Sequence, residues 1–386
     1  MDFFNIRHMN VFVLAVQTGS VSGAADRAHL TQPAASQGIA KLETALGSPL
    51  LHRGAGGVSL TGAGKVFAPR VARALGFLNA QKPLSNKLAA AQLRALIAVG
   101  DTGSFTIAAR QLGLAQPTVH RAARTLEQIV GSTLFRSYSH GVALTQAGEV
   151  LFQNAKLAHA ELRQAQEEVA VLLGRGGTQI VIGSLPLARS EILPRAISSM
   201  VELDPSTQVR VIDGRYGELL RGLRLGDLDF LIGALRDPAP FGDVQEEVLF
   251  QDDLAVICRP GHPLARQRTV DLKETLAFPW IAPPKTTPSG QYLFEALGIA
   301  DLETTPVRVV SSSLMMVRQM LLQGDFVSVI SRHQIDHEVR AGQIAVLPIA
   351  LEGSRRPIGL STRKSWRPTE PQMRMLEQIR RSARRI

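Results

Sequence analysis

The apolar and polar positions in the first part of the chain follow a helical period. Residues 9–17 carry apolar side chains at helical spacing, and Gly19 follows where a helix can end in the left-handed conformation. Ser20 and Thr31 are both good N-caps, and each precedes another helical pattern. Residues 50–60 contain three glycines and are typical of two short strands joined by a turn. The pattern therefore predicts three helices followed by a hairpin.

The same pattern returns 84 residues later. Residues 18–64 align with residues 102–148 without a gap, and nineteen of the forty-seven positions are identical. A repeat of this length indicates a duplicated structural module. In each copy, two short helices meet at a tight turn and the second helix has a polar outer face, which is typical of a helix-turn-helix.

Composition and charge narrow the class of protein. The chain has 386 residues, 45% of them hydrophobic, which suggests two to four globular domains. Residues 1–174 hold 16 Lys and Arg against 9 Asp and Glu, whereas residues 175–353 hold 17 against 22. A basic N-terminal part favours a polyanionic partner there, although basic surfaces also serve solubility alone.

Compartment and membrane association follow from what the chain lacks. Its single cysteine, Cys258, excludes an intrachain disulfide framework and a cysteine-based zinc site. No apolar run approaches the length of a membrane span. We therefore expect a cytoplasmic protein with no membrane partner.

The residues of the first module resemble those of a known family. They are Gly19-Ser20, Ala24-Ala25, Leu30-Thr31-Gln32-Pro33-Ala34-Ala35-Ser36, Leu42-Glu43, Gly47, Leu50, Leu60-Thr61 and Gly64. This pattern resembles the winged helix-turn-helix of LysR-type transcriptional regulators, and the resemblance extends through the rest of the chain. The family normally has one such module per chain, whereas this sequence has two. The resemblance implies double-stranded DNA as a partner and a homodimer or homotetramer.

Candidate DNA contacts lie at the start of the third helix of each module, because Gln, Ser, Arg and Lys side chains read base edges and phosphates in the major groove. In the first module, the resemblance implies contacts from Thr31, Gln32, Pro33, Ser36 and Gln37, with Arg53 of the wing on the DNA backbone. Lys41 is a further candidate, because it faces outward on the same helix. In the second module, the candidates are Gln116, Pro117, Thr118, His120, Arg121 and Arg124. We expect the second copy to prefer a different half-site. Alternatively, one copy is only structural or dimerising.

A long helix is expected after the second module. Its apolar positions recur at spacings of four and three and are Leu151, Ala155, Ala158, Leu162, Ala165, Val169 and Leu172. This seam predicts pairing with a partner chain, where the linker helix of the family dimerises. The alternative is an amphipathic helix that packs on its own domain. Because Pro83 shortens the equivalent stretch after the first module, only the second linker is expected to dimerise.

The remaining residues alternate strands with helices, which predicts parallel sheets covered by helices. This part resembles the two-subdomain, periplasmic-binding-protein-like effector region of LysR-type regulators. The expected fold is α/β and multidomain. Its expected parts are two tandem winged helix-turn-helix domains (1–84 and 85–148), a linker and dimerisation helix (149–175) and an effector-binding domain (176–386).

Candidate effector ligands follow predicted strands or open predicted helices, where α/β proteins bind small molecules. They are Ser184, Leu185, Arg189, Arg215, Lys285, Thr286, Ser311, Ser312 and Ser313. Arg189 and Lys285 favour a small organic acid, with a neutral sugar as the next choice. Each serine taken alone is better explained as a simple N-cap.

The sequence suggests no catalytic residue, metal site or cofactor. His333 and His337 stand four apart, but no third metal ligand accompanies them. The motif G-x-S-x-G of one hydrolase class does not occur. The expected function is therefore a DNA-binding transcriptional regulator that responds to a small molecule. The alternative is a small-molecule sensor or binding protein whose second helix-turn-helix module is only structural.

Overall fold

The computed structural model describes residues 4–384 except residues 55, 140, 237–240 and 299–304. Two compact units divide the chain, Met1–Gln179 with Arg224–Asp227 and Ile180–Leu223 with Leu228–Ile386. In the described residues, no helix combines the length and the apolar character needed to cross a membrane.

The first module of unit one has the predicted three helices and hairpin. Its elements are α1 (Ile6–Thr18), α2 (Val21–Ala28), α3 (Gln32–Leu46), β1 (Leu51–Gly54) and β2 (Gly57–Leu60). Ser20 and Thr31 act as N-caps, because their side chains accept hydrogen bonds from the N–H groups of Gly23 and Ala34. Gly19 ends α1 with φ +68°, a conformation that suits glycine.

The second module repeats this arrangement. Its elements are α5 (Ala90–Thr102), α6 (Phe105–Leu112), α7 (Gln116–Val130), β3 (Phe135–Tyr138) and β4 (Gly141–Leu144). Glu43 Oε1 accepts hydrogen bonds from the N–H groups at the start of β1, and Glu127 Oε1 does the same before β3. The two copies differ at the start of α7, where Ala115 provides no side-chain cap.

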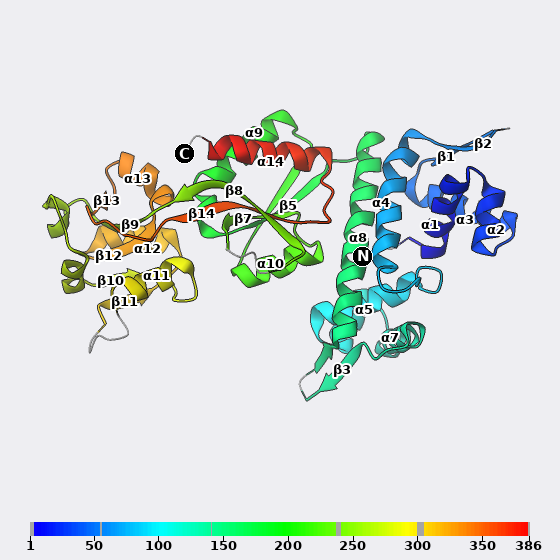
Figure 1. Cartoon of the computed structure of the whole chain (residues 1–386), viewed down its shortest axis with the longest axis horizontal. Helices are drawn as coiled ribbons and strands as arrows, with labels where there is room; N and C mark the ends of the chain where they lie inside the picture. Colours follow the sequence, from blue (N-terminus) through cyan, green and yellow to red (C-terminus); the bar gives the residue numbers. More distant parts are fainter. Residues whose placement is uncertain (1–3, 55, 140, 237–240, 299–304, 385–386) are drawn as a thin grey trace. The chain divides into compact units, whose positions relative to one another are not determined.

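Each module leads into a longer helix, and these two helices pack against each other within the chain (Figure 1). They are α4 (Gly62–Leu78) and α8 (Gln146–Leu172). The predicted seam of α8 is buried from Leu151 to Val169, whereas Leu172 is 53% exposed. The expectation that this seam meets a partner chain is therefore wrong, because α4 of the same chain helps to cover it. Pro83 does follow the end of α4, but the helix is already long enough to pair.

Buried charges join the two helices. The guanidinium of Arg70 on α4 lies 2.9 Å from the Glu168 carboxylate and 3.2 Å from the Glu161 carboxylate. Gln164 Oε1 accepts a further hydrogen bond of 2.9 Å from Arg70 Nη1. Arg73 Nη2 lies 2.7 Å from the second oxygen of Glu161. Together these contacts satisfy charges that would be costly to bury alone.

Unit two contains two five-stranded sheets, each covered by helices. The first sheet has the order β6 (Gln208–Asp213), β5 (Gln179–Ser184), β7 (Phe230–Ala234), β14 (Arg356–Arg363), β8 (Val244–Asp252). The second has the order β11 (Val307–Val310), β10 (Trp280–Ala282), β12 (Val327–Ser331), β9 (Leu254–Cys258), β13 (Ala345–Val346). The helices are α9 (Ile192–Leu203), α10 (Tyr216–Leu225), α11 (Pro288–Ala296), α12 (Leu314–Gln323), α13 (Asp336–Arg340) and α14 (Glu370–Ala383).

The sheets are mixed, which corrects the expectation of parallel sheets. β5 runs parallel to β7, but β14 runs antiparallel to both of its neighbours. In the second sheet β9 is antiparallel to β12 and β13. Two of these strands carry little signal in the sequence, because β8 is half-exposed with irregular alternation and β13 has only two residues.

A buried carboxylate stabilises the junction between the two sheets of unit two. Asp252 ends β8, directly before β9, and accepts hydrogen bonds from the Ser331 hydroxyl at 2.7 Å and the Arg356 guanidinium at 3.2 Å. Arg356 Nη1 also donates to the hydroxyl of Ser289 at 2.6 Å. Burial raises the pKa of Asp252 despite these partners. The network joins residues of β8, β12, β14 and α11, and so fixes the junction beside which the cavity described below lies.

Candidate DNA-binding and effector-binding sites

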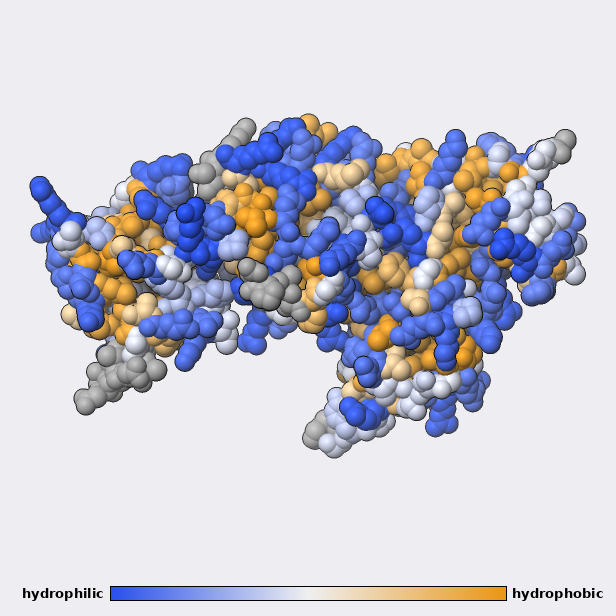
Figure 2. Space-filling view, in the orientation of Figure 1, coloured by the Kyte–Doolittle hydropathy of each residue, from blue (hydrophilic) through white to orange (hydrophobic). Residues whose placement is uncertain are grey.

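α3 and its N-cap present most of the predicted contact residues to solvent. The exposed ones are Thr31, Gln32, Pro33, Gln37 and Lys41. Ile39 and Leu42 point inward and are buried, as the sequence predicted. Residues three or four apart share a helix face, so the exposed side chains form one polar surface. In Figure 2 the right-hand end of the molecule, where α2 and α3 lie, is mostly hydrophilic or neutral.

The wing is connected to this surface. Arg53 of β1 donates a hydrogen bond of 3.2 Å from Nη1 to the half-buried hydroxyl of Ser36 on α3. Its Nη2 lies 4.0 Å from the carboxylate of Glu43. The guanidinium therefore lies beside the polar face of α3, and the structure brings Arg53 and Ser36 together.

The corresponding face of α7 has a different chemistry. Its exposed predicted residues are Gln116, Pro117, Thr118, Arg121 and Arg124. His120 is half-buried, because its ring stacks on Phe105 with centroids 3.8 Å apart and planes inclined by 22°. Two arginines thus occupy α7 where α3 carries Gln37 and Ala40 at the equivalent positions. The stacking leaves His120 less free to reach a DNA base than the sequence suggested.

Unit two contains a cavity of about 940 Å³. It lies between residues of the short 3-10 helix η1 (Pro186–Arg189), the start of α9, the start of α12, and the segment formed by the 3-10 helix η5 (Arg332–Ile335) and α13. Ser313 caps α12 by accepting a hydrogen bond from the N–H of Met316. Helix starts of this kind expose N–H groups that a polar ligand can use.

Three of the predicted effector residues line this cavity, namely Arg189, Ser312 and Ser313. The other six are placed elsewhere: Ser184, Leu185, Arg215, Lys285, Thr286 and Ser311.

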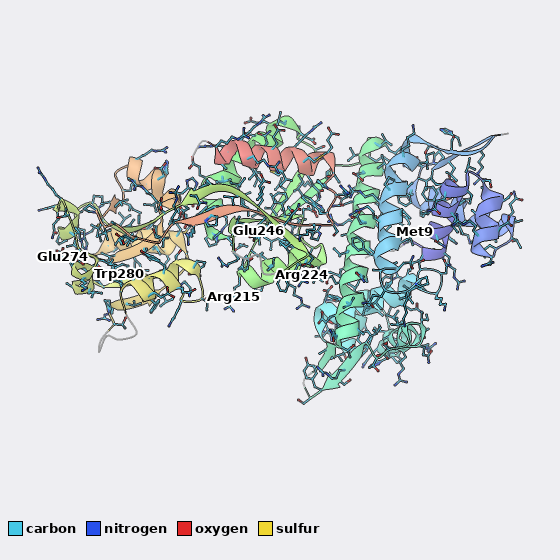
Figure 3. All side chains as sticks on the ribbon, in the orientation of Figure 1. Met9, Arg215, Arg224, Glu246, Glu274 and Trp280 are labelled. Atoms are coloured by element: carbon cyan, nitrogen blue, oxygen red, sulfur yellow. The ribbon has the colours of Figure 1, made fainter. Side chains whose placement is uncertain are left out.

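Three of these six have other contacts. Ser184 is fully buried and donates a hydrogen bond to the carbonyl of Leu185. Arg215 directly precedes α10 (labelled in Figure 3), and its backbone N–H donates a hydrogen bond to the Glu218 carboxylate. Lys285 Nζ lies 5.6 Å from the ring centroid of Phe294. The sequence positions of strand ends and helix starts do not determine in which direction these side chains point.

Two further side chains of the cavity were not among the predicted effector ligands. His333 and Glu338 have side chains that are 6% and 7% exposed. Among the described residues, His333 Nε2 and Glu338 Oε2 have no hydrogen-bond partner. Burial lowers the pKa of His333, so its imidazole is neutral at pH 7. Buried polar atoms normally find partners, so a ligand in the cavity is a natural source of the missing hydrogen bonds.

The charged groups of the cavity are balanced. Each of its four arginines faces a carboxylate that also lines the cavity, in the pairs Arg189–Asp213, Arg195–Glu191, Arg318–Glu338 and Arg340–Asp336. Within the part of the chain that the structure describes, no three His, Cys, Asp or Glu side chains gather in a way that could hold a metal ion. The cavity is therefore polar without a large excess of either charge.

Comparison with known families assigns both parts of the chain. Residues 174–384 match the family described as the LysR substrate binding domain. Residues 6–65 and, separately, residues 90–149 match the bacterial regulatory helix-turn-helix proteins of the lysR family. The second match coincides with the second copy of the repeat.

Individual relatives differ in how much of the chain they match. The HTH-type transcriptional regulator GalR of Pseudomonas putida is 32% identical over 368 residues, which cover 93% of this chain and 92% of GalR. The regulator PcaQ of Agrobacterium fabrum is 27% identical and covers 75% of this chain but 94% of PcaQ. About a quarter of the chain thus has no counterpart in PcaQ, whereas the alignment with GalR is too long to omit either module.

Solved structures show the same fold. A full-length point variant of OxyR from Pseudomonas aeruginosa has a TM-score of 0.56 and 24% identity, and covers 77% of this chain and 95% of its own. CbnR, a LysR family transcriptional regulator, has a TM-score of 0.50 and 20% identity, and covers 76% of this chain and 98% of its own. Both lack a counterpart to about a quarter of this chain, as PcaQ does.

Proposed function

We propose that this chain, which belongs to the LysR family of bacterial transcriptional regulators, binds double-stranded DNA through α3 and α7 and a small-molecule effector through the cavity of unit two. The LysR family is one of transcriptional regulators and not of enzymes. The observation that carries the DNA-binding proposal is the exposed polar face at the start of α3, with Arg53 of the wing beside it.

Contacts to bases and contacts to phosphates are proposed for different residues of this surface. Ser36 and Gln37 lie in the first two turns of α3, where side chains of a recognition helix reach base edges. Arg53 and Lys41 supply positive charge for phosphates. In the second module, Arg121 and Arg124 take both roles, while Gln116, Pro117 and Thr118 lie at the start of α7 against the DNA backbone.

The effector proposal rests on His333 and Glu338. A ligand that supplies a donor to Glu338 Oε2 and either a donor or an acceptor to His333 Nε2 would satisfy both buried atoms. Arg189, Ser312 and Ser313 complete the polar lining. We infer that effector binding favours one arrangement of unit two, because a ligand shifts a conformational equilibrium only by binding its states unequally.

The chemical class of the effector is proposed as a small organic acid or a sugar. An acid would compete with the carboxylates that already pair with the cavity arginines, for example Asp213 with Arg189. A sugar hydroxyl donates and accepts hydrogen bonds, so it suits His333 and Glu338 without breaking an ion pair. The balanced charges thus support the sugar at least as well as the acid.

The proposed DNA-binding and effector-binding functions are assigned to the domains expected from the sequence. Residues 1–84 and 85–148 form the two DNA-binding domains, residues 149–175 the linker helix and residues 176–386 the effector domain. The chain is proposed to act as a homodimer or homotetramer. Since the seam of α8 is already covered by its own chain, association would use another surface.

A footprinting experiment tests the proposed function. The full-length protein is incubated with the DNA upstream of its own gene, and the Gln37→Ala variant is compared with Gln323→Ala, a matched change at the end of α12. We expect the wild type and Gln323→Ala to protect the same segment, and Gln37→Ala to protect it less selectively. No protection at low salt, with mixtures of acids and sugars present, would favour the alternative of a small-molecule sensor.

A further inference from the structure

We propose that the two modules of one chain form a single two-headed DNA-binding body that occupies two half-sites of unlike sequence, about one helical turn apart on one duplex. The proposal rests on the proposed function, because it requires that both modules bind DNA. It adds the geometry and the asymmetry of the DNA that the chain recognises. The partner is therefore a duplex with a defined direction, and one chain suffices for both half-sites.

One hydrophobic cluster extends from the first module into part of the second, whereas Ala108, Ala109 and Val119 of the second module belong to a separate, smaller cluster. The larger cluster includes Phe12 and Ile39 of the first module, Leu78 of α4, Leu126 of the second module and Leu162 of α8. Close-packed cores resist relative motion of the elements that build them. The modules are therefore parts of one rigid body and are not independent domains joined by a flexible linker.

The helices α4 and α8 run antiparallel. A Cβ placed on Gly62 would lie 3.7 Å from Leu172 Cδ2, so the start of α4 meets the end of α8. Further along α4, Arg70 meets Glu168, and Arg73 meets Glu161. Residue numbers thus rise along α4 as they fall along α8.

The two helices also use equivalent faces. Positions that correspond by the 84-residue offset are buried in both helices, in the pairs Phe67 and Leu151, Val71 and Ala155, Ala74 and Ala158, and Leu78 and Leu162. The joint between module and helix is repeated as well. Thr61 Oγ1 donates to the carbonyl of Pro49 at 2.7 Å, and Thr145 Oγ1 donates to the carbonyl of Thr133 at 2.7 Å.

Antiparallel helices that pack through equivalent faces are related by an approximate two-fold axis. Because each module is joined to its helix in the same way, the same axis relates the two modules and their recognition helices. Two helix-turn-helix units related by a two-fold axis are the arrangement with which dimeric proteins contact successive major grooves. Here a single chain contains both units.

The spacing along α8 fits one turn of DNA. The second module joins α8 at Gln146, whereas the first module contacts it near Gln166, which lines a small cavity with His8 and Lys41. Arg175 beyond the helix donates to the carbonyl of Gly47 at 3.2 Å. Twenty residues of helix from Gln146 to Gln166 span roughly 30 Å, close to the ~34 Å between major grooves one turn apart.

The two recognition helices differ in chemistry, so their half-sites differ. The exposed Gln37 of α3 corresponds to Arg121 of α7, and Ala40 corresponds to Arg124. Arginine pairs with guanine in two hydrogen bonds, whereas glutamine pairs with adenine. A homodimer of single-module chains reads the same sequence twice, but this chain reads two different ones.

Hydroxyl-radical footprinting of the full-length protein tests the proposal. The wild type is expected to protect two segments whose centres lie about 10–11 base pairs apart. Gln37→Ala with Arg53→Ala is expected to remove one segment, and Arg121→Ala with Arg124→Ala the other. Loss of the same segment in both variants would overturn the two-headed arrangement. Absence of any protection by the wild type would instead contradict the proposed function.

A spacer experiment separates a rigid body from tethered modules. Insertion of five base pairs between the two protected segments turns one half-site to the opposite side of the duplex. We expect affinity to fall at least ten-fold with this spacer, and insertion of ten or eleven base pairs not to restore it, because the half-sites then lie two helical turns apart, beyond the reach of a rigid body that spans one. An affinity that falls less than three-fold with the five-base-pair spacer would show that the modules move independently, which contradicts the proposal.

A disulfide shows whether the modules that pair belong to one chain. In Gly62→Cys with Leu172→Cys, oxidation is expected to link α4 to α8 within the chain, so the protein keeps the mass of one chain on a non-reducing gel. The single variants are the controls, and the native Cys258 is buried. A covalent dimer in the double variant alone would show that α4 pairs with another chain. We also expect the oxidised, monomeric double variant to bind DNA with the same affinity as the wild type.

Discussion

Arg70 and Glu161 form an ion pair of 3.2 Å between α4 and α8 in which each side chain is less than a tenth exposed. Arg73 contacts the other oxygen of the same carboxylate, so Glu161 joins two arginines of α4. The residues come from positions about 90 apart in the chain, and they hold the two linker helices together. The pair thus lies at the centre of the body that carries both DNA-binding modules.

Removal of the Arg70 charge should destabilise unit one. Arg70→Met leaves Glu161 buried with one cation fewer, and breaking such a pair costs about 3–5 kcal/mol. Arg381→Ala, which removes an exposed pair with Glu377, should cost less than about 1 kcal/mol. Circular dichroism during urea unfolding measures both. Fluorescence of Trp280 and Trp366 reports unit two alone and should not change with Arg70→Met.

Arg53 should act on DNA affinity without acting on base preference. Arg53→Ala removes one phosphate contact, so the affinity for every sequence should fall and the slope of log affinity against log salt should decrease by about 1. Binding titrations at several salt concentrations measure the slope. Lys65→Ala is the matched control, since Lys65 is an exposed cation on α4 and is not among the residues proposed to contact DNA. Equal slopes for Arg53→Ala and the wild type would remove Arg53 from the proposed interface.

The effector response should depend on His333 and not on Lys285. His333→Phe keeps the ring but removes the unsatisfied nitrogen, so an effector should lose at least ten-fold in affinity, the effect of about 1.4 kcal/mol. Lys285→Ala should bind as the wild type does, because Lys285 lies outside the cavity lining. Thermal-shift titration with sugars and small organic acids measures both variants. A ligand that binds His333→Phe normally but fails with Lys285→Ala would move the site to the loop after β10.

Acid should destabilise unit one through His159 on α8. Burial, followed by the charges of Arg163 and Lys156, lowers the pKa of His159 from 6.5 to about 4. The folded state therefore binds this proton less readily than the unfolded chain. The contribution of neutral His159 to the free energy of unfolding is fully present above pH 6.5 and is lost as the pH falls towards 4. The free energy of unfolding should fall by about 2 kcal/mol more between pH 7 and pH 5 than in His159→Gln. Parallel pH curves for the two proteins would exclude this role.

Cys258 should be inert in the folded protein. Its thiol is fully buried on β9, and burial raises its pKa to about 12. Because the thiolate is the reactive form, a thiol reagent should label the native protein hardly at all and label it fully in urea. Gly62→Cys adds an exposed thiol and should react at once under native conditions. Rapid native labelling of Cys258 would show that β9 opens readily.

Local features of the sequence predicted the modules well. Ser20, Thr31 and Gly19 determine helix ends through their own backbone neighbours, so their roles did not depend on distant residues. The seam of α8 was predicted as apolar, but a periodicity does not say whether its partner is in the same chain. The pairing with α4 became visible only once both helices were placed.

The cavity was predicted less completely, because side-chain direction depends on tertiary packing. The rule that ligands bind at strand ends and helix starts found Arg189 and Ser313 but also selected Ser184 and Lys285, whose side chains point elsewhere. His333 follows the end of β12 by two residues, so the same rule applied to this strand would have found it. Glu338 has no such signal, because it reaches the cavity only through the position of α13.

The packing of α4 on α8 also sets how DNA binding responds to protein concentration. In a regulator whose modules are brought together by association of two chains, dilution separates them, and half of the interface is lost. Here the modules are joined by a single polypeptide, so their pairing has no concentration dependence and each holds the other near the DNA at a high effective concentration. At a protein concentration low enough for dimers to dissociate, a single copy of this chain would still bring both modules to one duplex.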